Sequence, residues 1–215
     1  SLKSIKKYCQ FADSAKIPIV EVGHGNGLGA SSILIGESPY SDKEILSTAR
    51  KHLINSKLGV HIIPGLATIR KDIDQAIDLG VDVFRVASHC TEATITRSHI
   101  EYLKKNNKTV FGVLMMTALT GVKELVVNAK IMEDYGAEAL IIMDSTGTYL
   151  PYDVEERIRA LSDKLSIKIG FHAHNNLGMS VYNSIVAIQN GATYIDACIR
   201  GFGAGAGNTP LEVLV

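Results

Sequence analysis

Seven short apolar runs, each separated from the next by the pattern of an amphipathic helix, constrain the fold of this chain more than any other feature. The runs are rich in Val, Ile and Leu and show little polar alternation, as expected of strands buried on both faces of a parallel sheet. They occupy residues 17–23, 57–63, 81–87, 109–115, 138–144, 167–174 and 193–199. Strands that alternate with helices are typical of βα units. We therefore expect an α/β protein with a parallel sheet.

The segments between the runs contain helical patterns of apolar and polar residues. Helices are predicted at 41–53, 68–80, 99–107, 121–136 and 151–165. Gly80, Asn106 and Gly136 stand at or near the ends of three of these segments, where such residues often terminate helices.

The number of units favours a TIM barrel. Seven units in 215 residues approach the eight strands and roughly 250 residues of a typical (β/α)8 barrel. The chain opens with a helix pattern over 1–16 and closes with the start of another over 208–215. We expect a single TIM-barrel domain over 1–215 that lacks its first strand and the end of its last helix.

Charge and composition exclude several classes of partner. The chain has 22 basic and 22 acidic residues, without the basic excess that binding to nucleic acid or an anionic membrane usually brings. No apolar run approaches the length of a membrane span, and no signal-peptide pattern opens the chain. The three cysteines are too few and too scattered for a disulfide framework or a zinc site. We expect a cytoplasmic protein with a small-molecule ligand.

Two histidines, His172 and His174 in "FHAHNN", end the sixth apolar run. Side chains on a strand alternate between faces, so both imidazoles are expected to point the same way. Active sites of TIM barrels lie at the C-terminal ends of the strands, and imidazole is a ligand for Mn²⁺, Co²⁺ and Zn²⁺. We interpret the pair as metal ligands. The alternative is one histidine packed in the core and the other in a surface loop.

Other polar residues gather at the ends of the runs. Glu21 and Arg85 are charges within apolar runs, which is costly unless they are paired or bind a ligand. Each residue taken singly has a structural explanation, such as a hydrogen bond in a turn. His24, His89, Asp144 and Ser145 follow or end three of the runs. With the histidine pair, polar residues stand at the ends of four runs, which is hard to explain by packing alone.

Two glycine-rich loops remain. "GNGLGA" (25–30) matches a dinucleotide fingerprint, but Gly and Pro intervene before the next helix and the next strand ends without an acidic residue, so we reject that reading. "GFGAGAGNTPLE" (201–212) offers backbone amides that suit a carboxylate or phosphate. There Thr209 is expected to cap a helix, with Pro210 at its first position and Glu212 completing a capping box.

Six motifs together resemble a known family. They are, in order, "EVGHGNGL", "RVASHCTEA", "VLMMT", "DSTG", "GFHAHNNLGMSVYNSIVAIQNGA" and "GAGAGNTPLEV". They are similar to the 4-hydroxy-2-oxovalerate aldolases, which belong to a metal-dependent superfamily that includes HMG-CoA lyase and isopropylmalate synthase. The resemblance covers essentially the whole chain. The histidine motif is shared by the superfamily, whereas "HCTEA" and "GAGAGN" point to the aldolases.

The resemblance implies a lyase that cleaves 4-hydroxy-2-oxopentanoate to pyruvate and acetaldehyde, a reaction of aromatic hydrocarbon catabolism. A divalent metal acts as the Lewis acid, typically Mn²⁺, with Mg²⁺ or Co²⁺ as alternatives. His172 and His174 match the metal histidines, while Ser145 and His172 match residues that contact substrate. Glu21 matches a carboxylate that orients the catalytic arginine. Supporting positions are Glu21, His24, Arg85, His89 and Asn208.

The sequence also departs from the family pattern. The family carries an Arg-Asp pair on its first strand and a His shortly after it, which supply the catalytic arginine, the third metal ligand and the base. We find no candidate for them, so the catalytic residues are expected upstream of this sequence. The C-terminal helical region that docks an acylating acetaldehyde dehydrogenase is also missing. Unpaired sheet edges favour a homo-oligomer.

Two alternatives stay open at this stage. One is another HMG-CoA lyase-like enzyme or an acyl-CoA-dependent synthase, although the loop "GFGAGAGN" lacks the cysteine expected of the lyase. The other is a non-catalytic barrel fragment that binds a metal or a small anion.

Overall fold

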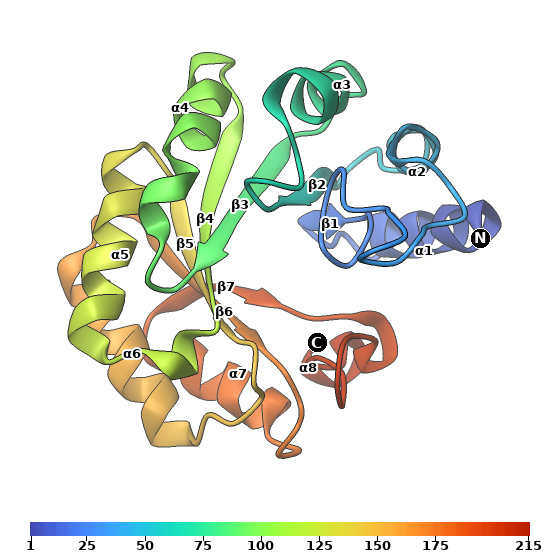
Figure 1. The fold of residues 1–215 in the computed structure, drawn as a ribbon. Coiled ribbons are helices and arrows are strands. Elements are labelled where there is room, and N and C mark those ends of the chain that lie inside the picture. The colour runs from blue at the N-terminus through green and yellow to red at the C-terminus, as the bar shows by residue number, and fades with distance from the viewer. The chain divides into compact units, whose positions relative to one another are not determined.

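The computed structural model describes all of residues 1–215, with seven strands alternating with helices (Figure 1). The seven predicted strands are confirmed, and their ends lie within three residues of those expected. The strands are β1 (Ile19–Glu21), β2 (Lys57–Ile62), β3 (Val83–His89), β4 (Thr109–Met115), β5 (Ala139–Asp144), β6 (Lys168–Ala173) and β7 (Ala192–Asp196).

Eight α-helices precede, separate and follow these strands along the chain. They are α1 (Leu2–Ser14), α2 (Asp42–Arg50), α3 (Asp74–Asp78), α4 (Arg97–Lys105), α5 (Val122–Asp134), α6 (Pro151–Lys164), α7 (Ser180–Gln189) and α8 (Leu211–Leu214). The single helix predicted over 68–80 is wrong in detail, because a π-helical turn at Ile69–Ile73 precedes α3. There the Asp72 carboxylate accepts hydrogen bonds from the backbone N–H and the hydroxyl of Thr68.

The predicted capping box of the last helix is also wrong. α8 begins at Leu211, with Pro210 before it and no side-chain cap. The fully buried hydroxyl of Thr209 instead lies within hydrogen-bonding distance of Ser180 O and Ser184 Oγ. Glu212 accepts the backbone N–H of Arg200 at 2.9 Å. Thr209 and Glu212 therefore form hydrogen bonds with other segments of the chain instead of capping α8.

One predicted helix terminator is displaced by a residue. The chain leaves α4 through Asn107, whose φ of 55° is left-handed, rather than through Asn106. Gly80 and Gly136 do terminate their helices in the left-handed region, with φ of 82° and 107°.

The chain divides into two compact units, one of residues 1–86 and 101–110, the other of residues 87–100 and 111–215. In the first unit β1 pairs with β2 and β2 with β3, all parallel. In the second unit β4, β5, β6 and β7 pair in chain order, again all parallel. The predicted α/β architecture is confirmed. One barrel domain over 1–215 stays a prediction.

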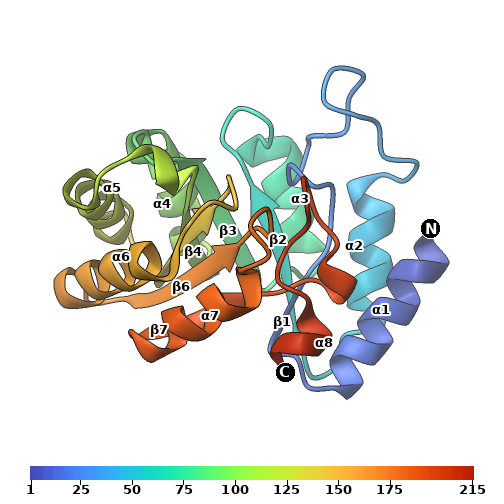
Figure 2. The ribbon, with the colours of Figure 1, turned by 90° about the horizontal axis from the view of Figure 1, so that it is seen from below.

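Burial explains why the strands read as continuous apolar runs. In β5 the consecutive residues 139–142 are each at most 1% exposed, so both faces of the strand are covered. In the second unit, α5 packs against β5, α6 against β6, and α7 against β6 and β7 (Figures 1 and 2). Burying each large aliphatic side chain contributes roughly 1.5–3 kcal/mol. No helix is both long enough and apolar enough to span a membrane.

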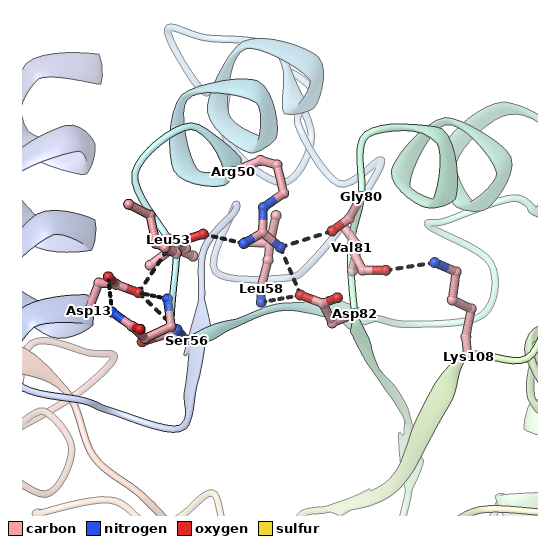
Figure 3. A network of polar contacts seen from close by, with 11 residues as sticks. Asp13, Arg50, Leu53, Ser56, Leu58, Gly80, Val81, Asp82 and Lys108 are labelled. Atoms are coloured by element: carbon pink, nitrogen blue, oxygen red, sulfur yellow. Dashed lines mark hydrogen bonds and ion pairs between the residues drawn. The ribbon is translucent and has the colours of Figure 1, made fainter.

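A polar network joins the helices and strands of the first unit (Figure 3). Arg50 on α2 forms an ion pair with Asp82 at 2.8 Å and also donates to the carbonyls of Leu53 and Gly80. Asp82 in turn accepts the backbone N–H of Leu58 at 2.8 Å. The network fixes the entry into β2 and β3.

Asp13, near the end of α1, anchors the turn before β2 (Figure 3). Its Oδ1 accepts the backbone N–H groups of Ile54, Asn55 and Ser56 at 2.9, 2.7 and 2.8 Å. Its Oδ2 accepts the side-chain amide of Asn55 at 3.0 Å. These hydrogen bonds, the one from Ser56 first, lower the pKa of Asp13 below its ordinary value.

We expect Asp13→Ala to lower the urea midpoint of unfolding at pH 7, because three backbone donors lose their acceptor. A lowered carboxyl pKa stabilises the fold above the ordinary aspartate pKa, and that stabilisation disappears as the pH falls through the lowered value. The midpoints of the chain and the variant should therefore converge in acid. The exposed Asp163→Ala is the control, and an equal midpoint shift in both variants would contradict the role of Asp13.

Candidate functional site

The two predicted strand charges of the first unit form an ion pair. Arg85 Nη1 lies 3.2 Å from Glu21 Oε2, and the Arg85 side chain is only 10% exposed. Pairing offsets the cost of burying these charges in apolar strands. The carboxylate of Glu21 is thus held in place at the end of β1.

His24 uses both ring nitrogens to close the loop after β1. Its Nδ1 accepts the backbone N–H of Asn26 at 3.1 Å, and its Nε2 lies 3.1 Å from the carbonyl oxygen of Gly36. A carbonyl only accepts, so the neutral ring carries its proton on Nε2. His24 therefore supports the loop rather than offering a lone pair.

No helix opens from the glycine-rich residues 25–30, whereas a dinucleotide fingerprint requires one.

In the second unit, hydrogen bonds link the ends of β3, β4 and β5. The Cys90 N–H donates to Met115 O at 2.9 Å and its thiol to Met116 O at 3.3 Å. Met116 N–H donates to Ser145 Oγ at 2.9 Å. Because Ser145 Oγ accepts this bond, its own proton remains available to donate. Burial raises the pKa of the Cys90 thiol, so Cys90 is protonated at neutral pH.

Met116 adopts a left-handed conformation, with φ of 58° and ψ of 33°. Such a conformation is uncommon for residues other than glycine and is found disproportionately at functional sites. Here it turns the Met116 N–H toward Ser145. The sequence offered no signal for this turn.

A neutral histidine that binds a metal through Nε2 carries its proton on Nδ1. His89, the last residue of β3, has the opposite tautomer. Its Nδ1 lies 2.9 Å from the Thr91 hydroxyl and accepts the Thr91 N–H at 3.4 Å. The neutral ring therefore carries its proton on Nε2 and presents a donor.

Asp144 shapes the loop that carries Ser145. The carboxylate is fully buried, and it accepts the backbone N–H groups of Thr148 at 3.1 Å and Tyr149 at 3.0 Å. It also accepts the Thr146 hydroxyl at 3.1 Å. Asp144 therefore makes hydrogen bonds within a turn, which is the structural explanation that the sequence allowed for it.

Replacing Asp144 by alanine is expected to destabilise the chain by about 1–3 kcal/mol, because the buried N–H of Tyr149 and the N–H of the more exposed Thr148 lose their acceptor. Urea unfolding followed by circular dichroism measures the change. Asp144→Asn keeps one carbonyl oxygen and should lose less. A loss below about 0.5 kcal/mol for Asp144→Ala, similar to an ordinary surface change, would contradict this assignment.

His172 and His174 lie side by side at the end of β6, with ring centroids 5.1 Å apart. His172 Nδ1 is 3.0 Å from Asp196 Oδ2, and His174 Nδ1 is 3.4 Å from the carbonyl oxygen of Ala204. Both oxygens are acceptors, so in the neutral rings both Nδ1 atoms carry the proton and both Nε2 atoms keep a lone pair. Burial first, and then His172, lower the pKa of His174, which favours its neutral form.

Asn208 lies beside this pair. Its backbone forms an antiparallel bridge with His174, and its side-chain amide donates to Phe202 O at 3.1 Å. Its Oδ1 is buried and has no hydrogen-bond partner. An unpartnered buried amide oxygen is costly unless something else binds it. Residues 1–215 contain no group of three or more His, Cys, Asp or Glu side chains placed to hold a metal.

Comparison with known proteins decides the family. The family model described as HMGL-like matches residues 1–215. The chain belongs to the HMGL-like family. Two curated relatives bear the name 4-hydroxy-2-oxovalerate aldolase. The one from Pectobacterium atrosepticum is 58% identical over 213 residues, which cover 99% of this chain and 62% of that protein. The one from Spirochaeta aurantia is 61% identical over 211 residues, covering 98% and 62%.

Solved structures agree on the fold of this HMGL-like chain. An N-terminal domain from Bacteroides vulgatus superposes with a TM-score of 0.81 at 25% identity, over 98% of this chain and 71% of that one. The carboxyl transferase domain of Rhizobium etli pyruvate carboxylase gives 0.73 at 19% identity, over 82% and 32%. The predicted TIM-barrel class is confirmed. The chain has seven strands and spans about three-fifths of the curated relatives' length.

The predicted site residues of the HMGL-like chain fall into two sets, one in each compact unit. That all of them lie on one common rim, at the C-terminal ends of the strands, stays a prediction. Asp196, which contacts His172, and Met116, which contacts Ser145, were missed from the sequence. The only available signal for Asp196 was an acidic residue at the end of an apolar run. The first unit holds Glu21, His24 and Arg85, and the second holds His89, Ser145, His172, His174 and Asn208.

Proposed function

We propose that the protein carrying this chain is a divalent-metal-dependent lyase that cleaves 4-hydroxy-2-oxopentanoate to pyruvate and acetaldehyde. The observation that carries the proposal is the His172–His174 pair, whose two Nε2 lone pairs are free at the end of a parallel strand. The names of relatives that are 58% and 61% identical support the choice of reaction.

The residues present fit one part of a metal centre. His172 and His174 would hold the metal through Nε2, and the unpartnered Oδ1 of Asn208, whose backbone bridges to His174, is proposed as a further oxygen donor. Imidazole and oxygen donors suit Mn²⁺ and Co²⁺, and Mg²⁺ accepts the oxygens. When bound, the metal supplies Lewis-acid polarisation of the substrate's 2-oxo group.

The other side chains bind and orient the substrate in this proposal. Ser145 donates its hydroxyl proton to a substrate oxygen, because Met116 N–H already occupies one of its lone pairs. His89 offers a further Nε2–H donor. Glu21, already held by Arg85, is proposed to orient the catalytic arginine.

Among residues 1–215, no third His, Cys, Asp or Glu side chain is placed to share a metal with the two Nε2 atoms. We therefore propose that the third metal ligand, the catalytic arginine and the base that accepts the proton of the 4-hydroxyl group lie outside these residues. A homo-oligomeric assembly, an acylating acetaldehyde dehydrogenase as partner, a cytoplasmic location and a place in aromatic hydrocarbon catabolism belong to the same proposal.

The test is a coupled assay of the intact protein with added Mn²⁺, in which lactate dehydrogenase reports pyruvate released from 4-hydroxy-2-oxopentanoate. The proposal predicts turnover that a chelator abolishes and Mn²⁺ restores. Turnover only with an acyl-CoA and a 2-oxo acid would favour a synthase. An intact protein that binds metal without either activity would favour a binding function.

A further inference from the structure

Asp196 occupies a position that ordinary strand pairing would not give it. It ends β7 and lies beside His172 of β6 in the parallel register, with its Oδ2 3.0 Å from His172 Nδ1. Both side chains are largely buried, at 21% and 11% exposed. The Asp196 carboxylate therefore faces Nδ1 of His172, while Nε2 of the same ring keeps its lone pair free.

A β-bulge produces this pairing. Ile169 pairs with Ala192, but Gly170 pairs with Tyr194, so Thr193 is an extra residue in β7. The Thr193 hydroxyl donates to the Ile169 carbonyl at 3.3 Å across the bulge. In an unbroken ladder Asp196 would pair with Ala173 and would point to the other face, because side chains alternate. Bulges re-aim side chains in this way next to active sites.

Gly170 permits the close approach of the strands at the bulge. A Cβ at this position would collide with the Ile141 side chain and with Tyr194 Cβ. The glycine, the extra threonine and the terminal aspartate thus act together to place one carboxylate.

We infer that Asp196 is the positioning residue of the histidine pair and holds His172 in the Nδ1–H tautomer, so that the Nε2 lone pair is available to a divalent cation. The carboxylate only accepts, so a neutral His172 must place its proton on Nδ1. Metal-ligating histidines commonly donate their second N–H in this way. The metal side of this inference rests on the proposed function, whereas the tautomer does not.

The two histidines differ in what holds them. His174 Nδ1 faces a backbone carbonyl, that of Ala204, at 3.4 Å. His172 depends on a side chain that a substitution removes. Asp196→Ala should therefore affect the tautomer of His172 and leave that of His174 unchanged.

The test is ¹⁵N NMR of the imidazoles in the metal-free intact protein at pH 8, above the ordinary imidazole pKa. The unaltered protein should show His172 mainly as the Nδ1–H form. In Asp196→Ala the Nε2–H form, which a free imidazole prefers, should become the major species. Asp163→Ala, which removes an exposed carboxylate of α6, should leave both rings unchanged. A His172 that is Nε2–H in the unaltered protein, or that keeps its tautomer in Asp196→Ala, would overturn the inference.

Titration of Zn²⁺ into the same samples separates the two proposals. Zn²⁺ should shift the Nε2 signals of both histidines, and Asp196→Ala should weaken that binding about 10–100-fold. If the tautomer depends on Asp196 but Zn²⁺ moves neither Nε2 signal, the role of Asp196 stands and the proposed metal function fails. Equal Zn²⁺ affinity in the unaltered protein and in Asp196→Ala would show that the carboxylate does not position the ligand.

Discussion

Replacing either His172 or His174 by alanine in the intact protein should remove the bound metal and nearly all aldolase turnover while the fold is kept. Each substitution deletes one of two neighbouring imidazole donors. Removing a single donor that stabilises developing negative charge costs about 10²–10³-fold in rate. Loss of the Lewis acid itself should cost at least as much. Metal analysis, the coupled pyruvate assay and circular dichroism measure the three quantities.

The matched control for this experiment is His52→Ala, a half-buried histidine of the first unit that is no part of the candidate site. It should keep both metal and turnover. Full metal occupancy in His172→Ala or His174→Ala would rule out that residue as a ligand.

The 215-residue chain on its own should bind Mn²⁺ weakly or not at all and should show no measurable cleavage of 4-hydroxy-2-oxopentanoate. Catalytic metal sites of this kind use three protein ligands, and these residues offer only two neighbouring histidines and one unpartnered amide oxygen. Asn208 is a neutral donor, so it does not replace a carboxylate in offsetting the metal's charge. The missing ligand and the missing arginine should each cost about 10²–10³-fold.

The coupled pyruvate assay with excess Mn²⁺ checks this expectation, with the intact protein assayed in parallel. Turnover by the chain near that of the intact protein would mean that the third ligand, the arginine and the base have been assigned to the wrong place.

The strands could be predicted from sequence because their physics is local. A strand covered on both faces needs apolar residues at every position, as residues 139–142 show. The histidine pair was predictable for a similar reason, since the two-residue period of a strand puts His172 and His174 on one face. The Glu21–Arg85 pair follows from the cost of burying a charge, although the partner of each charge was not specified by the sequence.

The features that were missed depend on contacts between distant segments. Asp196 reaches His172 only because Thr193 bulges out of β7, and no local pattern marks that bulge. The capping box at Thr209 failed because Ser180 and Ser184 compete for its hydroxyl, and because Arg200 N–H competes for Glu212. Met116 turns left-handed against its intrinsic preference, since Cys90 and Ser145 hold its carbonyl and N–H.

Electron spin-echo envelope modulation of the intact protein loaded with Mn²⁺ tests most directly whether His172 and His174 hold the metal. We expect ¹⁴N modulation from two coordinated imidazoles, replaced by the ¹⁵N pattern when only the histidines are labelled with ¹⁵N. Mn²⁺ that supports turnover but shows no coordinated imidazole nitrogen would contradict the assignment of His172 and His174 as the metal-holding pair.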